Sequence, residues 1–224
     1  MINVFLGIGC VATLAVASSV DAAFIIEPNG KASATNYLAG TGTGNSTAAG
    51  APTLMAPGLT PGAASVFGGE PYTYTYTPGA DGDNTVFAAG QVLNSNAGLN
   101  ASGIAAGGAG VYNVYLTYPE STNNSGQPTS YDVDSDGIAG SELSSSRDQN
   151  ILDVPNGLGV GLWELLGQIT VTDVNQVITF TIDLVNPPGY VGPRTAGVMF
   201  EPAVPEPASL ALMGLGGLAM MRRR

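Results

Sequence analysis

A cluster of acidic residues near the middle of the chain has the residue types and the spacing that best suit metal binding. Its members are Asp132, Asp134, Asp136 and Glu142. Aspartates at the first, third and fifth places, with Gly137 sixth, match the first half of a calcium loop, in which carboxylates converge and glycine permits a sharp turn. The second half departs from this pattern, because Leu143 stands at the twelfth place and the acid comes one residue early. We therefore expect either an eleven-residue loop that binds Ca²⁺ weakly or, as the favoured interpretation, a hairpin turn at the Asp-Gly pair.

The side chains on which most enzymes depend are missing from the sequence. The chain has no histidine, and its single cysteine, Cys10, lies in an apolar run near the start. This excludes Ser-His-Asp and Cys-His catalysis as well as zinc sites built from His or Cys. A pair of carboxylates, as in glycosidases, is what remains for an enzyme. The glutamates that could serve are Glu70, Glu120, Glu142 and Glu164. Their spacing does not pair them, so the sequence predicts a protein without catalytic activity and with no cofactor beyond the weakly indicated Ca²⁺.

Three tyrosines alternate with threonines in one short segment. They are Tyr72, Tyr74 and Tyr76. A spacing of two places them on one face of a strand, and an exposed row of rings could stack on the sugar rings of a glycan. The favoured alternative is that the rings pack inward while the threonines face solvent. Trp163, the single tryptophan, is interpreted as a core residue or the wall of a pocket.

Short strand-like segments separated by Gly, Pro and Asn supply the framework for these residues. The segments are 72–77, 111–118, 151–154, 168–172, 176–184 and 196–200. In the fifth segment the expected core face consists of Ile178, Phe180, Ile182 and Leu184. This pattern predicts an all-β fold, specifically an antiparallel β-sandwich. Residues 35–66 are small and turn-rich, and we expect them to form loops or a flexible N-terminal arm.

The order of several of these segments resembles a known type of domain. The segments are 109–119, 130–133, 148–150, 162–167 and 195–200. In this order they resemble the golvesin C-terminal type of domain, a jelly-roll-like β-sandwich of secreted bacterial proteins. The resemblance implies a strand, a loop, a hairpin, a buried tryptophan and then two antiparallel strands. It also implies a fold that is suspected of binding carbohydrate.

The body of the chain between its two ends is strongly acidic. Its cations are Lys31, Arg147 and Arg194, against fifteen acids, which gives a net charge of −12. Such a surface repels nucleic-acid phosphates and anionic lipid, so nucleic-acid binding is excluded. The body has no cysteine. It therefore gains no disulfides, and packing and strand pairing must hold it together.

The N-terminus has the features of an export signal. Residues 4–17 form an uncharged apolar stretch that is too short for an ordinary membrane-spanning helix. Small or modest residues at 20–22 predict cleavage by signal peptidase after Ala22 or Ala23. No Lys or Arg precedes the run, which departs from the usual pattern. The alternative is a buried N-terminal strand or helix.

The last 21 residues have three parts. Val204, Pro205, Glu206 and Pro207 come first, an uncharged run over 208–221 follows, and Arg222, Arg223 and Arg224 end the chain. A helix over the run would be about 21 Å long, shorter than a hydrocarbon core of about 30 Å. The three parts resemble a PEP-CTERM sorting signal of Gram-negative bacteria. The resemblance implies a transient inner-membrane anchor, retained by the arginines and processed by an exosortase.

We therefore expect four regions: a signal peptide at 1–23, a flexible small-residue-rich segment at 24–66, a β-sandwich domain at 67–203 and a sorting signal at 204–224. The expected function is that of an exported, non-enzymatic protein of the cell surface or extracellular matrix, within exopolysaccharide. Its expected processing partners are signal peptidase and exosortase. The alternative is a carbohydrate-binding module, and an enzyme that uses two carboxylates ranks third.

Overall fold

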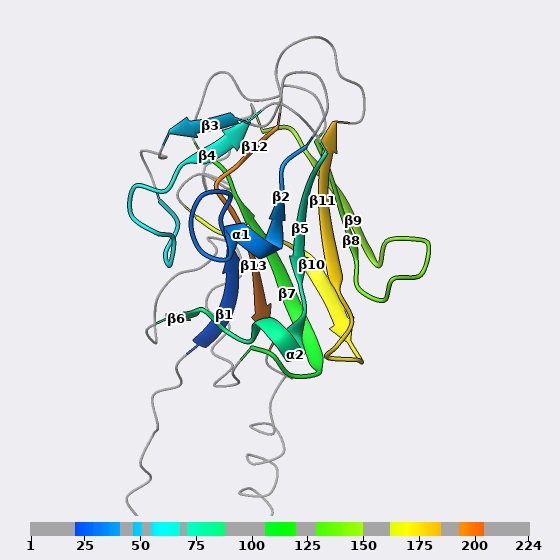
Figure 1. Cartoon of the computed structure of the whole chain (residues 1–224). Coiled ribbons are helices and arrows are strands. Elements are labelled where there is room, and N and C mark those ends of the chain that lie inside the picture. The colour runs from blue at the N-terminus through cyan, green and yellow to red at the C-terminus, as the bar shows by residue number, and fades with distance from the viewer. Residues whose placement is uncertain are drawn as a thin grey trace, which may run out of the picture.

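The computed structural model describes residues 21–40, 47–50, 55–67, 71–87, 106–119, 129–149, 162–184 and 193–203. In this part of the chain regular structure is almost entirely β-strand, and the strand pairings are antiparallel. Two five-stranded sheets lie face to face, and a small three-stranded sheet lies at one end (Figure 1). The predicted all-β, antiparallel architecture is therefore confirmed. The expected signal helix and C-terminal helix fall outside the described residues.

The first sheet contains strands from both ends of the described chain. Its order is β10-β7-β13-β1-β6. The strands are β1 (Asp21–Ile26), β6 (Thr85–Phe87), β7 (Gly110–Thr117), β10 (Glu164–Val171) and β13 (Gly197–Pro202). Strand β1 pairs with β13 through Phe24 and Phe200, so the two strands closest to the predicted export and sorting signals are neighbours.

The second sheet has the order β2-β5-β11-β8-β9. Its strands are β2 (Tyr37–Leu38), β5 (Tyr72–Tyr76), β8 (Thr129–Asp134), β9 (Leu143–Arg147) and β11 (Ile178–Leu184). The small sheet has the order β12-β4-β3 and contains β3 (Thr47–Gly50), β4 (Ser65–Phe67) and β12 (Arg194–Thr195). The helices α1 (Ser33–Asn36) and α2 (Pro78–Asp81) are single turns.

Alternating side chains fill the space between the two large sheets. Along β11, Ile178, Phe180 and Ile182 are fully buried, which confirms the predicted core face for these three residues. The side chain of Leu184 lies outside the described residues. Along β5 the three tyrosines are fully buried, while Thr73 and Thr75 between them are partly exposed. This alternation follows from the two-residue period of a strand, one face of which meets the opposite sheet.

An aromatic stack joins the two sheets inside the core. The ring of Tyr76, from the second sheet, stacks on Phe24 at a centroid distance of 4.8 Å and on Phe200 at 5.0 Å. Tyr112 meets the same ring edge-on at 5.8 Å. Offset-stacked and edge-to-face arrangements are the favoured geometries for aromatic pairs. The stack therefore fixes β1, β7 and β13 against β5.

Part of the first sheet is buried on its outer face as well. Residues Ile25, Tyr115 and Met199 on that face contact Trp163 and the segment 55–59 in a second apolar cluster. The indole N–H of Trp163 donates a hydrogen bond to the carbonyl of Pro57 (2.8 Å). Trp163 is fully buried, which confirms its interpretation as a core residue. The segment 55–59 is thereby fixed over the sheet.

The expected flexible arm at 24–66 is wrong for the described residues in that range. Strand β1 lies inside the first sheet, between β13 and β6, and the side chains of residues 22–26 are buried. The side chain of Asn84 extends this ladder, because its oxygen accepts the Ile25 N–H and its amide donates to the Ile25 carbonyl, each at 2.7 Å. At the end of β1 the buried Glu27 carboxylate accepts the backbone N–H groups of Lys31 (2.8 Å) and Thr60 (2.7 Å). Hydrogen bonds from the side chains of Asn84 and Glu27 therefore hold segments of the chain that have no long pattern of apolar residues.

The predicted strands agree with the observed ones within a few residues where the structure describes them. The segment 168–172 belongs to a longer strand, β10, which begins at Glu164. The predicted strand at 151–154 lies outside the described residues. The predicted strand set did not include β1, β2, β3, β4, β6, β8, β9 and β12, although residues 130–133 of β8 belong to the segments that carry the domain resemblance. Most of the missed strands are short and have no clear period-two pattern of apolar residues.

Candidate functional site

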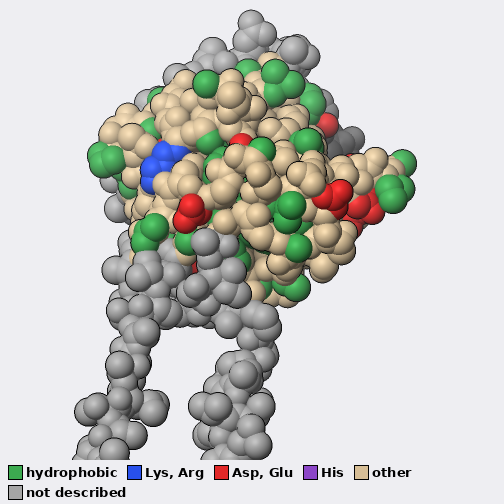
Figure 2. All heavy atoms as spheres, turned by 60° about the horizontal axis from the view of Figure 1, so that its bottom comes forward, with side chains coloured by type: hydrophobic (Ala, Val, Ile, Leu, Met, Phe, Trp, Pro, Cys, Tyr) green, Lys and Arg blue, Asp and Glu red, His purple; other side chains and the backbone are tan. Residues whose placement is uncertain are grey.

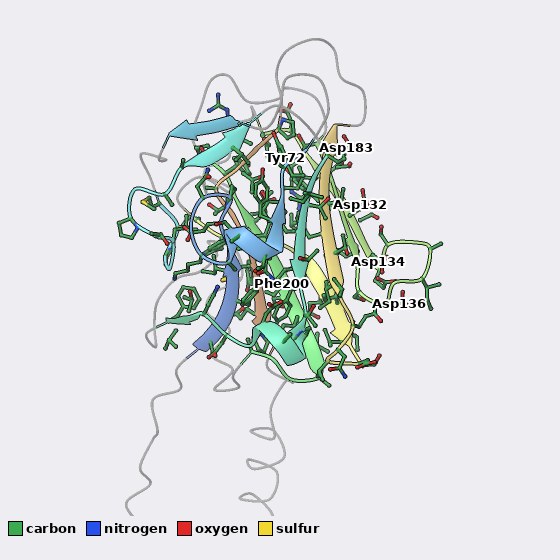
Figure 3. All side chains as sticks on the ribbon, in the orientation of Figure 1. Tyr72, Asp132, Asp134, Asp136, Asp183 and Phe200 are labelled. Carbon is green, nitrogen blue, oxygen red and sulfur yellow. The ribbon has the colours of Figure 1, made fainter. Side chains whose placement is uncertain are left out.

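The predicted hairpin turn joins β8 to β9, and it brings three carboxylates together. One oxygen from each of Asp134, Asp136 and Glu142 lies within 4.8 Å of the other two. Asp136 and Glu142 are exposed and Asp134 is partly exposed, so the group faces solvent (Figure 3). Two oxygens on opposite sides of a bound Ca²⁺ are about 4.6–5.2 Å apart, so these three could ligate one ion.

Backbone N–H groups hold the carboxylates of this turn in place. An oxygen of Asp134 accepts hydrogen bonds from the N–H groups of Asp136 (3.1 Å) and Gly137 (2.7 Å). One oxygen of Glu142 accepts the N–H of Ser135 (2.5 Å) and its hydroxyl (3.1 Å). Gly137 has φ of 73°, a left-handed conformation that glycine adopts readily. The turn is therefore ordered by its own side chains, as the hairpin interpretation requires.

Asp132, the fourth predicted ligand, is not part of this group. It lies on β8 opposite Ser144 of β9, whose hydroxyl donates to its carboxylate at 2.6 Å. Figure 3 shows Asp132 further from the β8–β9 turn than Asp134 and Asp136. Of the four residues in the sequence pattern, the structure thus brings three together.

The predicted glycan-stacking role of Tyr72, Tyr74 and Tyr76 is wrong. All three side chains are fully buried between the sheets, and burial raises the pKa of Tyr74 and Tyr76. The Tyr76 hydroxyl accepts the Gly107 N–H at 3.0 Å, and the Tyr72 hydroxyl donates to a backbone carbonyl. No Phe, Tyr or Trp whose side-chain burial the structure describes is exposed, so ring stacking on a glycan has no support among these residues.

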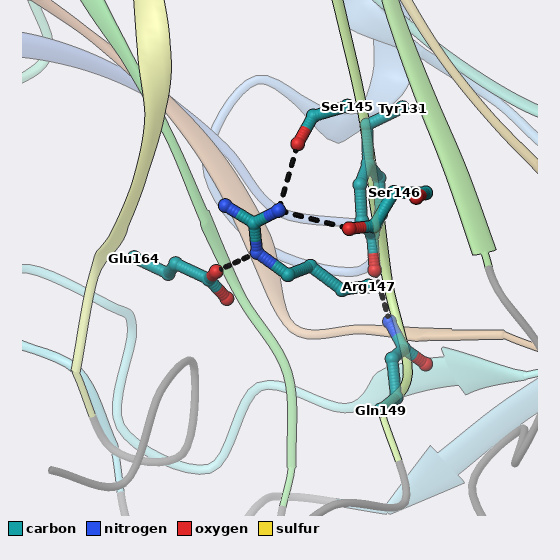
Figure 4. A network of polar contacts seen from close by, with 6 residues as sticks. All are labelled: Tyr131, Ser145, Ser146, Arg147, Gln149 and Glu164. Carbon is teal, nitrogen blue, oxygen red and sulfur yellow. Dashed lines mark hydrogen bonds and ion pairs between the residues drawn. The ribbon is translucent and has the colours of Figure 1, made fainter. Parts of the chain in front are cut away.

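The candidate catalytic glutamates are not brought together as a pair. Glu164 is almost fully buried and forms an ion pair with Arg147, which links β10 of the first sheet to β9 of the second (Figure 4). Glu142 belongs to the exposed turn. Glu70 and Glu120 lie outside the described residues. Burial raises the pKa of the Glu164 carboxyl, and the Arg147 guanidinium opposes that rise.

A polar network around this ion pair was not predicted from the sequence. The guanidinium of Arg147 also donates to the Ser145 hydroxyl (2.9 Å) and to the Ser146 carbonyl (2.8 Å). Nearby, the Gln149 amide donates to the Tyr131 hydroxyl at 2.9 Å. Figure 4 shows both groups of contacts at the end of β9. The network stabilises the junction between the sheets, and local sequence carries no signal for contacts of this kind.

A family model for the protein-sorting motif named PEP-CTERM matches residues 203–224. The chain carries a PEP-CTERM sorting motif. The match covers Val204–Pro207 and Arg222–Arg224, which lie outside the described residues, and it begins at Ala203, which the structure does describe. The motif implies an exported protein that is processed by an exosortase. In the part of the chain described, no helix is long and apolar enough to cross a membrane.

Two further comparisons concern the rest of the chain. No curated protein matches the sequence. Among solved structures, a Paenibacillus xanthan lyase is similar, with 19% sequence identity and a TM-score of 0.44. The similarity covers 83% of this chain and 13% of the lyase chain.

Proposed function

We propose that this protein is an exported, non-catalytic component of the cell surface or extracellular matrix, released to its destination through its PEP-CTERM motif. The observation that carries the proposal is the motif itself, which begins at the last described residue of the sandwich. In the proposed route, signal peptidase removes the leader, the apolar run 208–221 forms a transient inner-membrane anchor, and exosortase processes the motif. The arginines at 222–224 would remain on the inner side of the membrane.

The arrangement of carboxylates supports a role without catalysis. Glycoside hydrolysis needs two carboxyl groups that face one bond of the substrate. In the structure Glu164 is paired with a cation inside the protein, and Glu142 accepts hydrogen bonds within a surface turn. The acidic body, with a net charge of −12, suits a protein that stays soluble outside the cell and repels its own copies.

Cell fractionation of the full-length protein tests the proposal. The experiment follows the wild type and a Pro205→Ala, Pro207→Ala variant in a bacterium that carries an exosortase. We expect the wild type at the cell surface or in the matrix with a shortened C-terminus, and the variant in the inner-membrane fraction. Identical distributions of the two proteins would contradict the proposal. The same strains test the non-catalytic role. If the wild type depolymerised the matrix polysaccharide and a Glu164→Gln variant did not, that role would be contradicted.

Weak calcium binding at the β8–β9 turn is a second candidate function, favoured by the convergence of Asp134, Asp136 and Glu142. Calcium at ten times its Kd stabilises a protein by about 1.4 kcal/mol, which corresponds to about 3–6 °C in Tm for a domain of this size. Asp132→Asn is a matched control, because Asp132 lies in the same sequence pattern but outside the group. We expect Asp132→Asn to keep the Ca²⁺-dependent rise in Tm and Asp136→Asn to lose it. A wild-type Tm unchanged by millimolar Ca²⁺ would refute this candidate.

A further inference from the structure

The sorting motif follows the folded sandwich with no linker between them. Its first matched residue, Ala203, is buried, and its N–H donates to the carbonyl of Val111 at 2.7 Å. The two preceding residues pair with β7, Glu201 with Asn113 and Pro202 with Tyr112. The backbone that leads into the motif is therefore already engaged in the first sheet. We call residues Glu201–Ala203 the exit segment.

Among the described strands, the exit segment pairs with one neighbour, β7. The pairing of β13 with β1 ends at Phe200, whereas its pairing with β7 continues through Pro202. Backbone N–H groups alternate in direction along a strand, so the nitrogen of Pro202 faces away from β7. Proline at this position therefore removes no hydrogen bond to β7. Side chains add to the hold on β7, because the Glu201 carboxylate accepts the Tyr115 hydroxyl at 2.9 Å. Among the described strands, opening of the segment breaks its pairing with β7, and the pairing of Phe200 with β1 lies outside the segment.

Few residues separate the sandwich from the Pro-Glu-Pro motif, so an enzyme that binds the motif also lies close to the sandwich. An extended chain spans at most about 3.6 Å per residue, so Pro207 lies within about 14 Å of Ala203. The end of the sandwich from which β13 leaves carries scattered hydrophobic and acidic side chains (Figure 2). Val111, which holds the exit segment, and Val86 are partly or largely exposed. An enzyme that recognises the motif therefore meets a folded surface directly upstream of it.

We propose that the exit segment is a gate for sorting: the exosortase acts on the state in which Glu201–Ala203 have separated from β7. Enzymes and receptors that bind extended peptides form main-chain hydrogen bonds with them, and the exit segment cannot offer those groups while they pair with β7. Strand ends open locally at a low free energy without unfolding of the domain, and cleavage then follows the open population. The rate of processing is set by the pairing at the end of β13 as well as by the motif. The inference rests on the proposed sorting route.

A pulse-chase of the full-length precursor tests the gate in a bacterium that carries an exosortase. The first variant has a Gly-Ser hexapeptide between Ala203 and Val204, which supplies free backbone upstream of the motif. The matched control has the same hexapeptide after Ile138, in the exposed β8–β9 turn. We expect the precursor half-life to shorten at least about threefold in the first variant and to stay at the wild-type value in the control. Equal half-lives in all three proteins would overturn the gate.

A second variant separates opening of the segment from simple crowding by the sandwich. Tyr115→Phe removes a hydroxyl that holds Glu201 and leaves the motif and its spacing intact. We expect this variant also to shorten the half-life, and a hexapeptide effect without a Tyr115→Phe effect would overturn the gate in favour of crowding. The Pro205→Ala, Pro207→Ala variant gives the unprocessed reference. A wild-type precursor as long-lived as this reference would count against the sorting route itself.

Discussion

Two tyrosines on one strand provide a matched test of the buried polar contacts in the core. Tyr74 and Tyr76 are both fully buried on the inner face of β5. The Tyr76 hydroxyl accepts the Gly107 N–H (3.0 Å) and donates to the Gly82 carbonyl (3.3 Å). The Tyr74 hydroxyl lies near Thr195, but it makes no hydrogen bond of ordinary geometry with a described residue. Changing each to Phe removes one oxygen atom and leaves the ring.

The two substitutions are expected to differ in their effect on the free energy of unfolding. Loss of the two hydrogen bonds in Tyr76→Phe costs about 1–2 kcal/mol, reduced because the Gly107 N–H keeps a second acceptor, the Tyr112 hydroxyl at 3.1 Å. Tyr74→Phe removes a buried hydroxyl that has no hydrogen bond of ordinary geometry to a described residue, so its effect lies between zero and about 1 kcal/mol of stabilisation. The difference of about 2 kcal/mol corresponds to about 4–8 °C in Tm for a domain of this size.

Thermal and urea unfolding of residues 21–203 measure this difference. Equal m-values in the wild type and both variants would establish that the denatured states are comparable. We expect the Tm of Tyr76→Phe to fall and that of Tyr74→Phe to stay level or rise slightly. A Tyr74→Phe variant as destabilised as Tyr76→Phe would refute the hydrogen-bond assignment.

Three further predictions follow from individual contacts. Burial raises the pKa of Glu164 above its usual 4.5, so wild-type stability should fall as pH rises from about 4.5 through the raised value, and urea midpoints of Glu164→Gln should lack this fall. Glu27→Gln places an amide beside donors that the carboxylate accepted, so it should cost about 1–3 kcal/mol and speed hydrogen exchange at the Thr60 N–H, and an unchanged exchange rate would refute that role. Gly137→Ala should cost about 1 kcal/mol in thermal unfolding, because φ is 73° and the added Cβ would lie 2.7 Å from the Gln176 amide nitrogen; an unchanged Tm would contradict this.

Strands β5 and β11 could be predicted from the sequence because their side chains alternate. In β5 and β11 every second residue is aromatic or aliphatic and the residues between them are mainly threonine, so period and face follow directly. The role of the tyrosine row could not be fixed in this way. A row of rings on one face of a strand is compatible with burial and with exposure, and only the first sheet, which packs against that face, decides between them.

Contacts between distant segments were beyond local patterns. Strand β1 reads Asp-Ala-Ala-Phe-Ile-Ile, and both of its faces are buried, so no alternation distinguishes it from the end of the leader. The predicted cleavage positions after Ala22 and Ala23 lie inside this strand. The candidate calcium ligands were easier to predict, because Asp134, Asp136 and Glu142 belong to one turn. The ion pair between Glu164 and Arg147 joins two sheets, and the sequence around either residue does not indicate its partner.

The strand order couples completion of the fold to the position of the sorting motif. Strand β13 lies in the interior of the first sheet, where it pairs with both β7 and β1, and Phe24 meets Phe200 from opposite ends of the chain. Strands this far apart in sequence pair late in folding, because the conformational entropy of the intervening chain must be lost before their contacts form. The first sheet therefore cannot form until residues 197–202 have been exported, and the motif starts at the next residue. A motif in this position reaches the membrane when the last strand is available, so a precursor presented to the exosortase already contains every strand of the sandwich.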